Sequence, residues 1–142
     1  MVHVIEHPCI QHKLALIRDE ATGHKLFREL SSEITKFLCY EALKDLPTTA
    51  ITVRTPLAEA SCRTLGEEVV VVPILRAGVG MLDGVLDLVP TARVGFVGLD
   101  RDEGTKQPVT YYEKFPEQMS GGTCVIVDPM LATGGSTVAA ID

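Results

Sequence analysis

The sequence lacks a long hydrophobic run, an excess of positive charge and any closely spaced pair of cysteines. No apolar stretch reaches the ~20 residues that a membrane-spanning helix needs, so we expect no membrane association. Residues 1–10 contain no basic region followed by an apolar run, so we expect no signal peptide and a cytoplasmic protein. The net charge of −6, without a basic aromatic patch, argues against nucleic-acid binding.

The cysteines and histidines predict no metal site. Cys9, Cys39, Cys62 and Cys124 are widely spaced and form no Cys-x-x-Cys pair, which favours reduced thiols of a cytosolic protein over a disulfide framework. Cys39 and Cys124 stand among apolar residues, so we expect both in the core. The histidines near the N-terminus are scattered, and we expect exposed polar residues there rather than metal ligands.

The sequence does contain enough apolar residues for one domain. It has 142 residues, of which 46% are hydrophobic and 23% charged, as in ordinary soluble globular proteins. Apolar residues at helical spacing predict helices over residues 10–20 and 25–45, with Thr22 as the N-cap of the second. These helices make an N-terminal helical arm over about residues 1–46. Residues 50–65 favour extended structure and predict a hairpin or arm.

An α/β core over about residues 67–142 follows. The continuous β-branched run at residues 69–75 predicts a strand that is buried on both faces of a parallel sheet. The pattern beyond it predicts, in order, a helix (79–88), a strand (93–99), a strand or long loop (108–115) and a short buried strand (124–127). This alternation predicts an α/β fold with a mostly parallel sheet and flanking helices, in one domain over residues 1–142.

Residues 125–137, VIVDPMLATGGST, place an acid and a run of small residues between a strand and a helix. Small residues let backbone N–H groups approach an anion closely, and a helix N-terminus attracts negative charge. Thr133, Ser136 and Thr137 add hydroxyl donors. Ionised Asp128 only accepts hydrogen bonds, so it suits the hydroxyls of a sugar. The stretch therefore predicts a site for a phosphorylated sugar, with a plain glycine turn as the alternative.

Polar residues follow three of the predicted strands at their carboxyl ends, namely Arg76, Arg101 and Asp128. Ligands of open parallel sheets bind beyond these ends, so we expect the three side chains at one edge of the sheet. Two guanidinium groups beside the small-residue loop would form a site for a polyanion, because guanidinium binds phosphate oxygens in pairs. Alternatively, Arg76 is an ordinary surface residue and Arg101 pairs with the acids beside it.

The stretch VIVDPMLATGGST resembles the phosphoribosyl pyrophosphate (PRPP) binding motif of type I phosphoribosyltransferases. Its acid followed by Pro129, in place of two adjacent acids, is similar to the form found in uracil phosphoribosyltransferases. Leu75-Arg76-Ala77-Gly78 resembles the pyrophosphate loop of this family, and Arg101-Asp102-Glu103 resembles the start of its flexible loop. The resemblance implies a Rossmann-like, type I phosphoribosyltransferase fold that is incomplete at the C-terminus.

The resemblance also implies a reaction and a set of site residues. The family transfers the ribose 5-phosphate of PRPP to uracil, giving UMP and diphosphate in pyrimidine salvage, with Mg²⁺ carried by PRPP. Arg76, Arg101 and Asp128 would take part in catalysis. The residues expected to bind PRPP are Arg76, Ala77, Gly78, Arg101, Asp128, Pro129, Met130, Leu131, Ala132, Thr133, Gly134, Gly135 and Ser136. A homodimer or higher homo-oligomer and a GTP activator are further implications.

The resemblance implies that the family's uracil-reading segment and the last strands of its sheet have no counterpart within residues 1–142. We therefore expect a truncated form that keeps most of the PRPP site, lacks the base-binding segment and is inactive by itself. One alternative is another type I phosphoribosyltransferase, against which the Asp128-Pro129 pair argues. The others are a non-catalytic PRPP-sensing regulator and a flavodoxin-like domain without a ligand at the loop.

Overall fold

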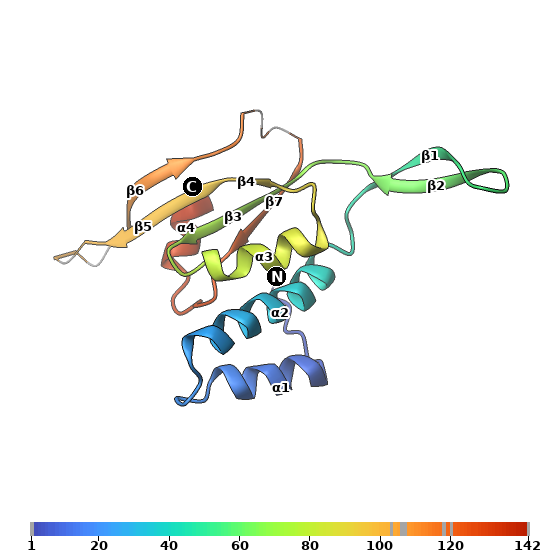
Figure 1. Cartoon of the computed structure of the whole chain (residues 1–142). Helices are drawn as coiled ribbons and strands as arrows, with labels where there is room; N and C mark the ends of the chain where they lie inside the picture. Colours follow the sequence, from blue (N-terminus) through green and yellow to red (C-terminus); the bar gives the residue numbers. More distant parts are fainter. Residues whose placement is uncertain (1, 103, 106–107, 118, 120, 142) are drawn as a thin grey trace.

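The computed structural model describes residues 2–102, 104–105, 108–117, 119 and 121–141. Two helices and a hairpin precede the α/β core (Figure 1). In chain order the elements are α1 (Pro8–Ile17), α2 (His24–Ala42), β1 (Thr48–Arg54), β2 (Glu59–Leu65), β3 (Val69–Leu75), α3 (Val79–Leu88), β4 (Arg93–Val94), β5 (Phe96–Arg101), β6 (Pro108–Lys114), β7 (Thr123–Val127) and α4 (Gly135–Ile141).

Strand β3 lies inside the sheet, as its continuous apolar sequence predicts. β7 runs parallel to β3 along one side, from the Val69–Thr123 pair to the Pro73–Val127 pair. β4 and β5 run parallel to β3 along its other side and act as one strand that is interrupted at Gly95. β6 pairs antiparallel with β5, so residues 108–115 contain a strand and not a long loop. The expected α/β class with a mostly parallel sheet is confirmed.

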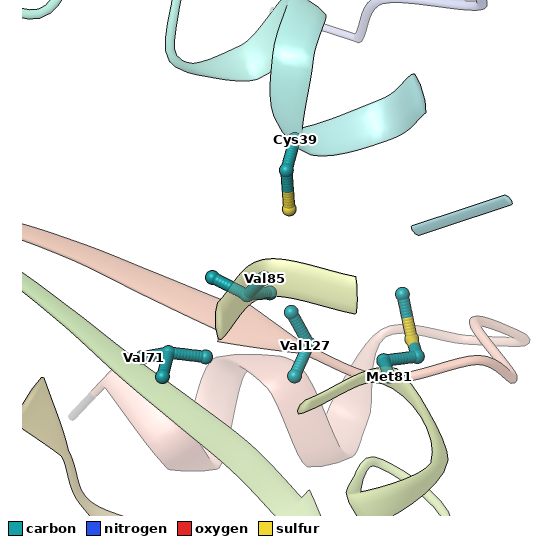
Figure 2. Close-up of a cluster of buried hydrophobic side chains, with 5 residues drawn as sticks. All are labelled: Cys39, Val71, Met81, Val85 and Val127. Carbon is teal, nitrogen blue, oxygen red and sulfur yellow. The ribbon is translucent and has the colours of Figure 1, made fainter. Parts of the chain in front are cut away.

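Side chains of β3 alternate between two buried layers. One layer lies toward α2 and α3 and consists of Cys39, Val71, Met81, Val85 and Val127 (Figure 2). The other lies on the α4 side of the sheet and consists of Val70, Val72, Ile74 and Val97. Because helices cover both faces of β3, neither face of the strand meets solvent. This is the reason that its sequence is continuously apolar instead of alternating between apolar and polar residues.

The N-terminal helices form a layer beyond α3. α2 packs on α3, and an ion pair of 2.6 Å joins Lys36 Nζ to Asp87 Oδ2 across them. α1 packs on α2, with Lys13 paired to Glu33. None of the helices in the described ranges is long and apolar enough to cross a bilayer.

The prediction that Thr22 caps the second helix is wrong. Gly23 occupies the N-cap position of α2. Thr22 Oγ1 instead donates a hydrogen bond of 2.6 Å to the Leu16 carbonyl near the end of α1. The boundaries of both helices differ from the predicted ones by one to three residues, because apolar spacing does not locate the last turn of a helix.

Two expectations for β7 are wrong. Among the described strands β7 pairs with β3 alone, so it is an edge strand, and only Val127 of its residues is buried. Cys124 is exposed, whereas Cys39 is buried as expected. The apolar sequence of residues 124–127 suits an edge strand and a central strand equally, and the order of the strands decides between them.

The hairpin β1–β2 extends away from the rest of the molecule (Figure 1). Its strands are antiparallel from the Thr48–Leu65 pair to the Arg54–Glu59 pair. Every residue of both strands is exposed except Val53 and Ala60, which pair with each other and are half-buried. The hairpin predicted at residues 50–65 is confirmed, and both of its faces are accessible.

Candidate functional site

The carboxyl ends of three parallel strands lie at one edge of the sheet. Arg76 follows β3, Asp128 follows β7, and β5 ends at Arg101. Since β5 and β7 flank β3 on its two sides, the three ends are neighbours. The backbone of Arg101 belongs to β5, but its side chain lies outside the described part of the chain, as does Glu103.

The turn after β3 packs directly against the end of β7. It consists of Arg76, Ala77 and Gly78, and the peptide bond before Arg76 is cis. A Cβ atom on Gly78 would lie 2.5 Å from the Val127 carbonyl oxygen and 2.6 Å from the Ile74 amide nitrogen, so only glycine fits there. The Gly78 amide donates a 2.8 Å hydrogen bond to the Ile74 carbonyl. The turn that carries Arg76 therefore lies beside the residue preceding Asp128.

Arg76 stands between two grooves of the surface. With Ala77, Pro129 and Met130 it lines the first groove, of about 880 Å³, whose remaining walls belong to α2 and α3. The second groove, of about 770 Å³, is lined by Leu75, Arg76, Ala77, Leu99, Asp100 and Tyr111. A ligand at Arg76 can therefore extend toward residues 128–130 on one side and toward β5 and β6 on the other.

Residues 128–137 form a tight loop between β7 and α4, which we call the glycine loop. It contains a small hollow of about 30 Å³ that is lined by Asp128 and residues 130–137. Gly134 has a φ of +78°, a left-handed conformation that glycine adopts readily. Its carbonyl accepts a 2.9 Å hydrogen bond from the Val138 amide, which begins α4. The predicted order of strand, small-residue loop and helix is confirmed.

Asp128 is half-buried at the start of the glycine loop. Its Oδ1 accepts a 3.2 Å hydrogen bond from the Met130 amide, which orients the carboxylate over the loop. An ionised carboxylate accepts hydrogen bonds and repels anions, so Asp128 suits the hydroxyl groups of a ligand. The side chains of Met130 and Leu131 are 76% and 71% exposed and bring no polar group to the loop.

The described residues include no group of three His, Cys, Asp or Glu side chains that could hold a metal ion. Asp102, near the end of β5, has its Oδ1 occupied by hydrogen bonds from the Thr105 amide, the Thr105 hydroxyl and the Gly104 amide. These bonds, those from Thr105 foremost, lower the pKa of the Asp102 carboxyl below its ordinary value. A divalent cation at this edge would need further oxygen ligands, such as those of a bound phosphate.

Sequence analysis did not assign Asp100 or Tyr111 to the site, although both line the second groove. Asp100 belongs to an acidic run that is typical of a solvated turn. Tyr111 lies in residues 108–115, and only the register of β6 against β5 brings it to the groove. No local signal in the sequence shows that register.

Residues 4–142 match the family model described as uracil phosphoribosyltransferase. The chain is 55% identical to the uracil phosphoribosyltransferase of Symbiobacterium thermophilum, over 99% of this chain and 68% of that protein. It is 53% identical to the uracil phosphoribosyltransferase of Acholeplasma laidlawii, over 97% of this chain and 66% of that protein.

A solved structure is similar to the fold. The AQ2163 protein from Aquifex aeolicus matches with a TM-score of 0.93 and 42% sequence identity, over 99% of this chain and 68% of that one. The chain thus spans about two thirds of the length of these relatives.

Proposed function

Because the chain belongs to the uracil phosphoribosyltransferase family, we propose that its site binds PRPP for the transfer of ribose 5-phosphate to uracil. The observation that carries the proposal is the close contact of Gly78 with the Val127 carbonyl. This contact holds the turn that carries Arg76 against the end of β7, which Asp128 follows. A guanidinium group and a carboxylate therefore lie at one edge of the sheet, where they would serve as a cation for diphosphate and an acceptor for ribose hydroxyls.

Each part of PRPP would meet a group of matching chemistry. Arg76 and Arg101 would bind the diphosphate, since guanidinium groups donate paired hydrogen bonds to phosphate oxygens. The glycine loop would bind the 5-phosphate with its amides and with the hydroxyls of residues 133 and 136. Asp128 would accept hydrogen bonds from the 2- and 3-hydroxyls of the ribose. Each hydrogen bond to a charged group contributes roughly 1.5–3 kcal/mol.

The proposed reaction is the one that the family resemblance implies. The bond between ribose C1 and the diphosphate oxygen breaks, uracil N1 bonds to C1, and the N1 proton is released. The sugar gains oxocarbenium character while the diphosphate gains negative charge. Arginines already oriented where that charge develops stabilise the transition state more than the ground state, which is the source of the rate increase.

Magnesium would arrive with the substrate. PRPP offers diphosphate oxygens and ribose hydroxyls, and Mg²⁺ on a phosphate ligand keeps several waters and takes few protein ligands. Bound in this way, the ion would neutralise part of the diphosphate charge.

The uracil site would not be formed by these residues alone. The chain spans about two thirds of the length of its relatives, and every described site residue is proposed above to contact a part of PRPP. We propose that this polypeptide binds PRPP and does not by itself transfer the ribosyl group. A cytoplasmic location, a homodimer or higher homo-oligomer, and a GTP activator are proposed from the family resemblance.

Calorimetric titration with magnesium PRPP tests the proposal. The unaltered chain should bind PRPP, and Arg76→Ala should weaken the affinity about tenfold or more, because charge-assisted hydrogen bonds are lost. Arg54→Ala, in the hairpin and far from the site, is the matched control and should bind as the unaltered chain does (Figure 1). Equal affinity in the Arg76→Ala variant would contradict the proposed site.

The same preparation tests the second part of the proposal. Incubated with PRPP and radiolabelled uracil, it should yield no UMP above background. Formation of labelled UMP would show that the base site is present after all.

A further inference from the structure

The pairing of β5 with β6 contains a β-bulge at Tyr111. Gly98 pairs with Tyr112 and Leu99 pairs with Thr110, so Tyr111 is the extra residue of β6. A bulge releases one residue from the hydrogen-bonded ladder and redirects its side chain, and such bulges are common beside functional sites.

The aromatic ring of Tyr111 lies over Gly98. A Cβ atom on Gly98 would be 2.6 Å from Tyr111 Cζ and 2.7 Å from its Cε2, so the ring occupies the space that a side chain at position 98 would fill. Cζ is the ring atom that bears the hydroxyl. The bulge and the glycine together therefore determine where this hydroxyl lies.

The residue that carries this hydroxyl belongs to the wall of the groove beside Arg76. Tyr111 lines the second groove together with Arg76 and Asp100, and its side chain remains accessible, because the residue is 54% exposed. A hydroxyl donor in the wall of this groove can bind a phosphate oxygen without adding charge.

We propose that Tyr111 is a substrate-binding residue whose hydroxyl donates a hydrogen bond to the diphosphate of PRPP beside Arg76. The inference rests on the proposed function, in which Arg76 holds that diphosphate. A tyrosine suits the task because its ring is rigid and immobilising it loses little conformational freedom. A purely structural role, in which the ring only covers the glycine, is the competing explanation.

Tyr111→Phe separates the two explanations, because it keeps the ring over Gly98 and removes the hydroxyl. In calorimetric titrations with magnesium diphosphate and with magnesium PRPP, this variant should bind both about tenfold more weakly than the unaltered chain. Ribose 5-phosphate, which has no diphosphate, should bind equally to both. Tyr112→Phe is the matched control, since Tyr112 stays in the ladder and does not line the groove, and it should change none of the three affinities.

A second pair of variants tests the placement of the ring. Gly98→Ala should displace the Tyr111 ring and weaken diphosphate binding to a similar extent. In a Tyr111→Ala background the same glycine change should have no additional effect on binding, because no ring remains to be displaced. Chemical unfolding of each variant would show whether the fold is retained.

The outcomes for the two proposals are distinguishable. If Arg76→Ala loses PRPP affinity while Tyr111→Phe binds diphosphate like the unaltered chain, the role of Tyr111 is refuted and the PRPP site stands. If the unaltered chain binds neither diphosphate nor PRPP, the proposed function is refuted and the role of Tyr111 with it.

Discussion

At the scale of single residues, the four cysteine thiols differ in how far each is buried in the fold. Cys39 is buried between α2 and the sheet, whereas Cys9, Cys62 and Cys124 are exposed. Burial raises the pKa of the Cys39 thiol, and desolvation by neighbouring atoms raises the pKa of the Cys124 thiol, although that residue is exposed. The thiolate is the reactive form, so a higher pKa means a smaller reactive fraction at a given pH.

We predict a fixed order of alkylation at about pH 8, a pH slightly below the ordinary thiol pKa. Cys9 and Cys62 should react first with iodoacetamide, Cys124 more slowly, and Cys39 last. Raising the pH should accelerate Cys124, and Cys39 should react fully only when denaturant unfolds the chain. Peptide mapping by mass spectrometry measures the order, and equal rates for Cys39 and Cys62 in the folded chain would contradict the packing of α2.

At the scale of secondary-structure elements, the close approach of α2 and α3 depends on one glycine. A Cβ atom on Gly84 would lie 2.5 Å from the Ser32 carbonyl oxygen and 2.8 Å from Thr35 Cβ. Thr35 is fully buried at this crossing, and its Oγ1 donates a hydrogen bond to the Ser31 carbonyl. Gly80, one turn earlier on α3, would place a Cβ no nearer than 3.7 Å to Ser31 Oγ.

The two glycines provide a matched pair of variants. Gly84→Ala should lower the free energy of unfolding by about 1–3 kcal/mol, because overpacking against backbone outweighs the better helix propensity of alanine. Gly80→Ala should leave stability unchanged or raise it by up to about 1 kcal/mol, since its new methyl group meets only ordinary contacts. Urea unfolding followed by circular dichroism measures both, and similar effects in the two variants would contradict the close helix crossing.

At the scale of the whole molecule, the hairpin β1–β2 exposes an apolar face. Alternation along the paired strands puts the Ile51–Cys62 and Val53–Ala60 pairs on the same face. Ile51 is 40% exposed there. A two-stranded hairpin is only marginally stable by itself in water, so a projecting one with an apolar face benefits from a partner. The hairpin therefore supports the proposed homodimer with a surface on which a second copy can pack.

A charged residue placed on the Ile51 face of the hairpin should weaken the proposed dimer. The unaltered chain should elute as a dimer or larger assembly in size-exclusion chromatography with light scattering, and Ile51→Asp should shift it toward the monomer. Thr52→Asp is the control, because this substitution adds the same charge on the opposite face of the hairpin. A monomeric unaltered chain, or equal dissociation in both variants, would contradict packing through the Ile51 face.

Local sequence determined the helices and strands of this protein and the polar residues that follow its parallel strands. The valine run of β3, the apolar spacing of α2 and the small residues of the glycine loop each act within one segment, so their structures follow from neighbouring residues. The positions of Arg76 and Asp128 at the ends of parallel strands also follow, because parallel strands end at the same edge of a sheet.

Only the tertiary structure decided the features that depend on which segments pair. Among the described strands, the strand order made β7 an edge strand and exposed Cys124, although its apolar sequence suits a buried strand equally well. The register of β6 against β5 produced the bulge that brings Tyr111 to Gly98. Hydrogen bonds between strands join residues that are far apart in the chain. Because backbone N–H and C=O groups are the same in every residue, the sequence of one strand does not specify its neighbouring strand or its register.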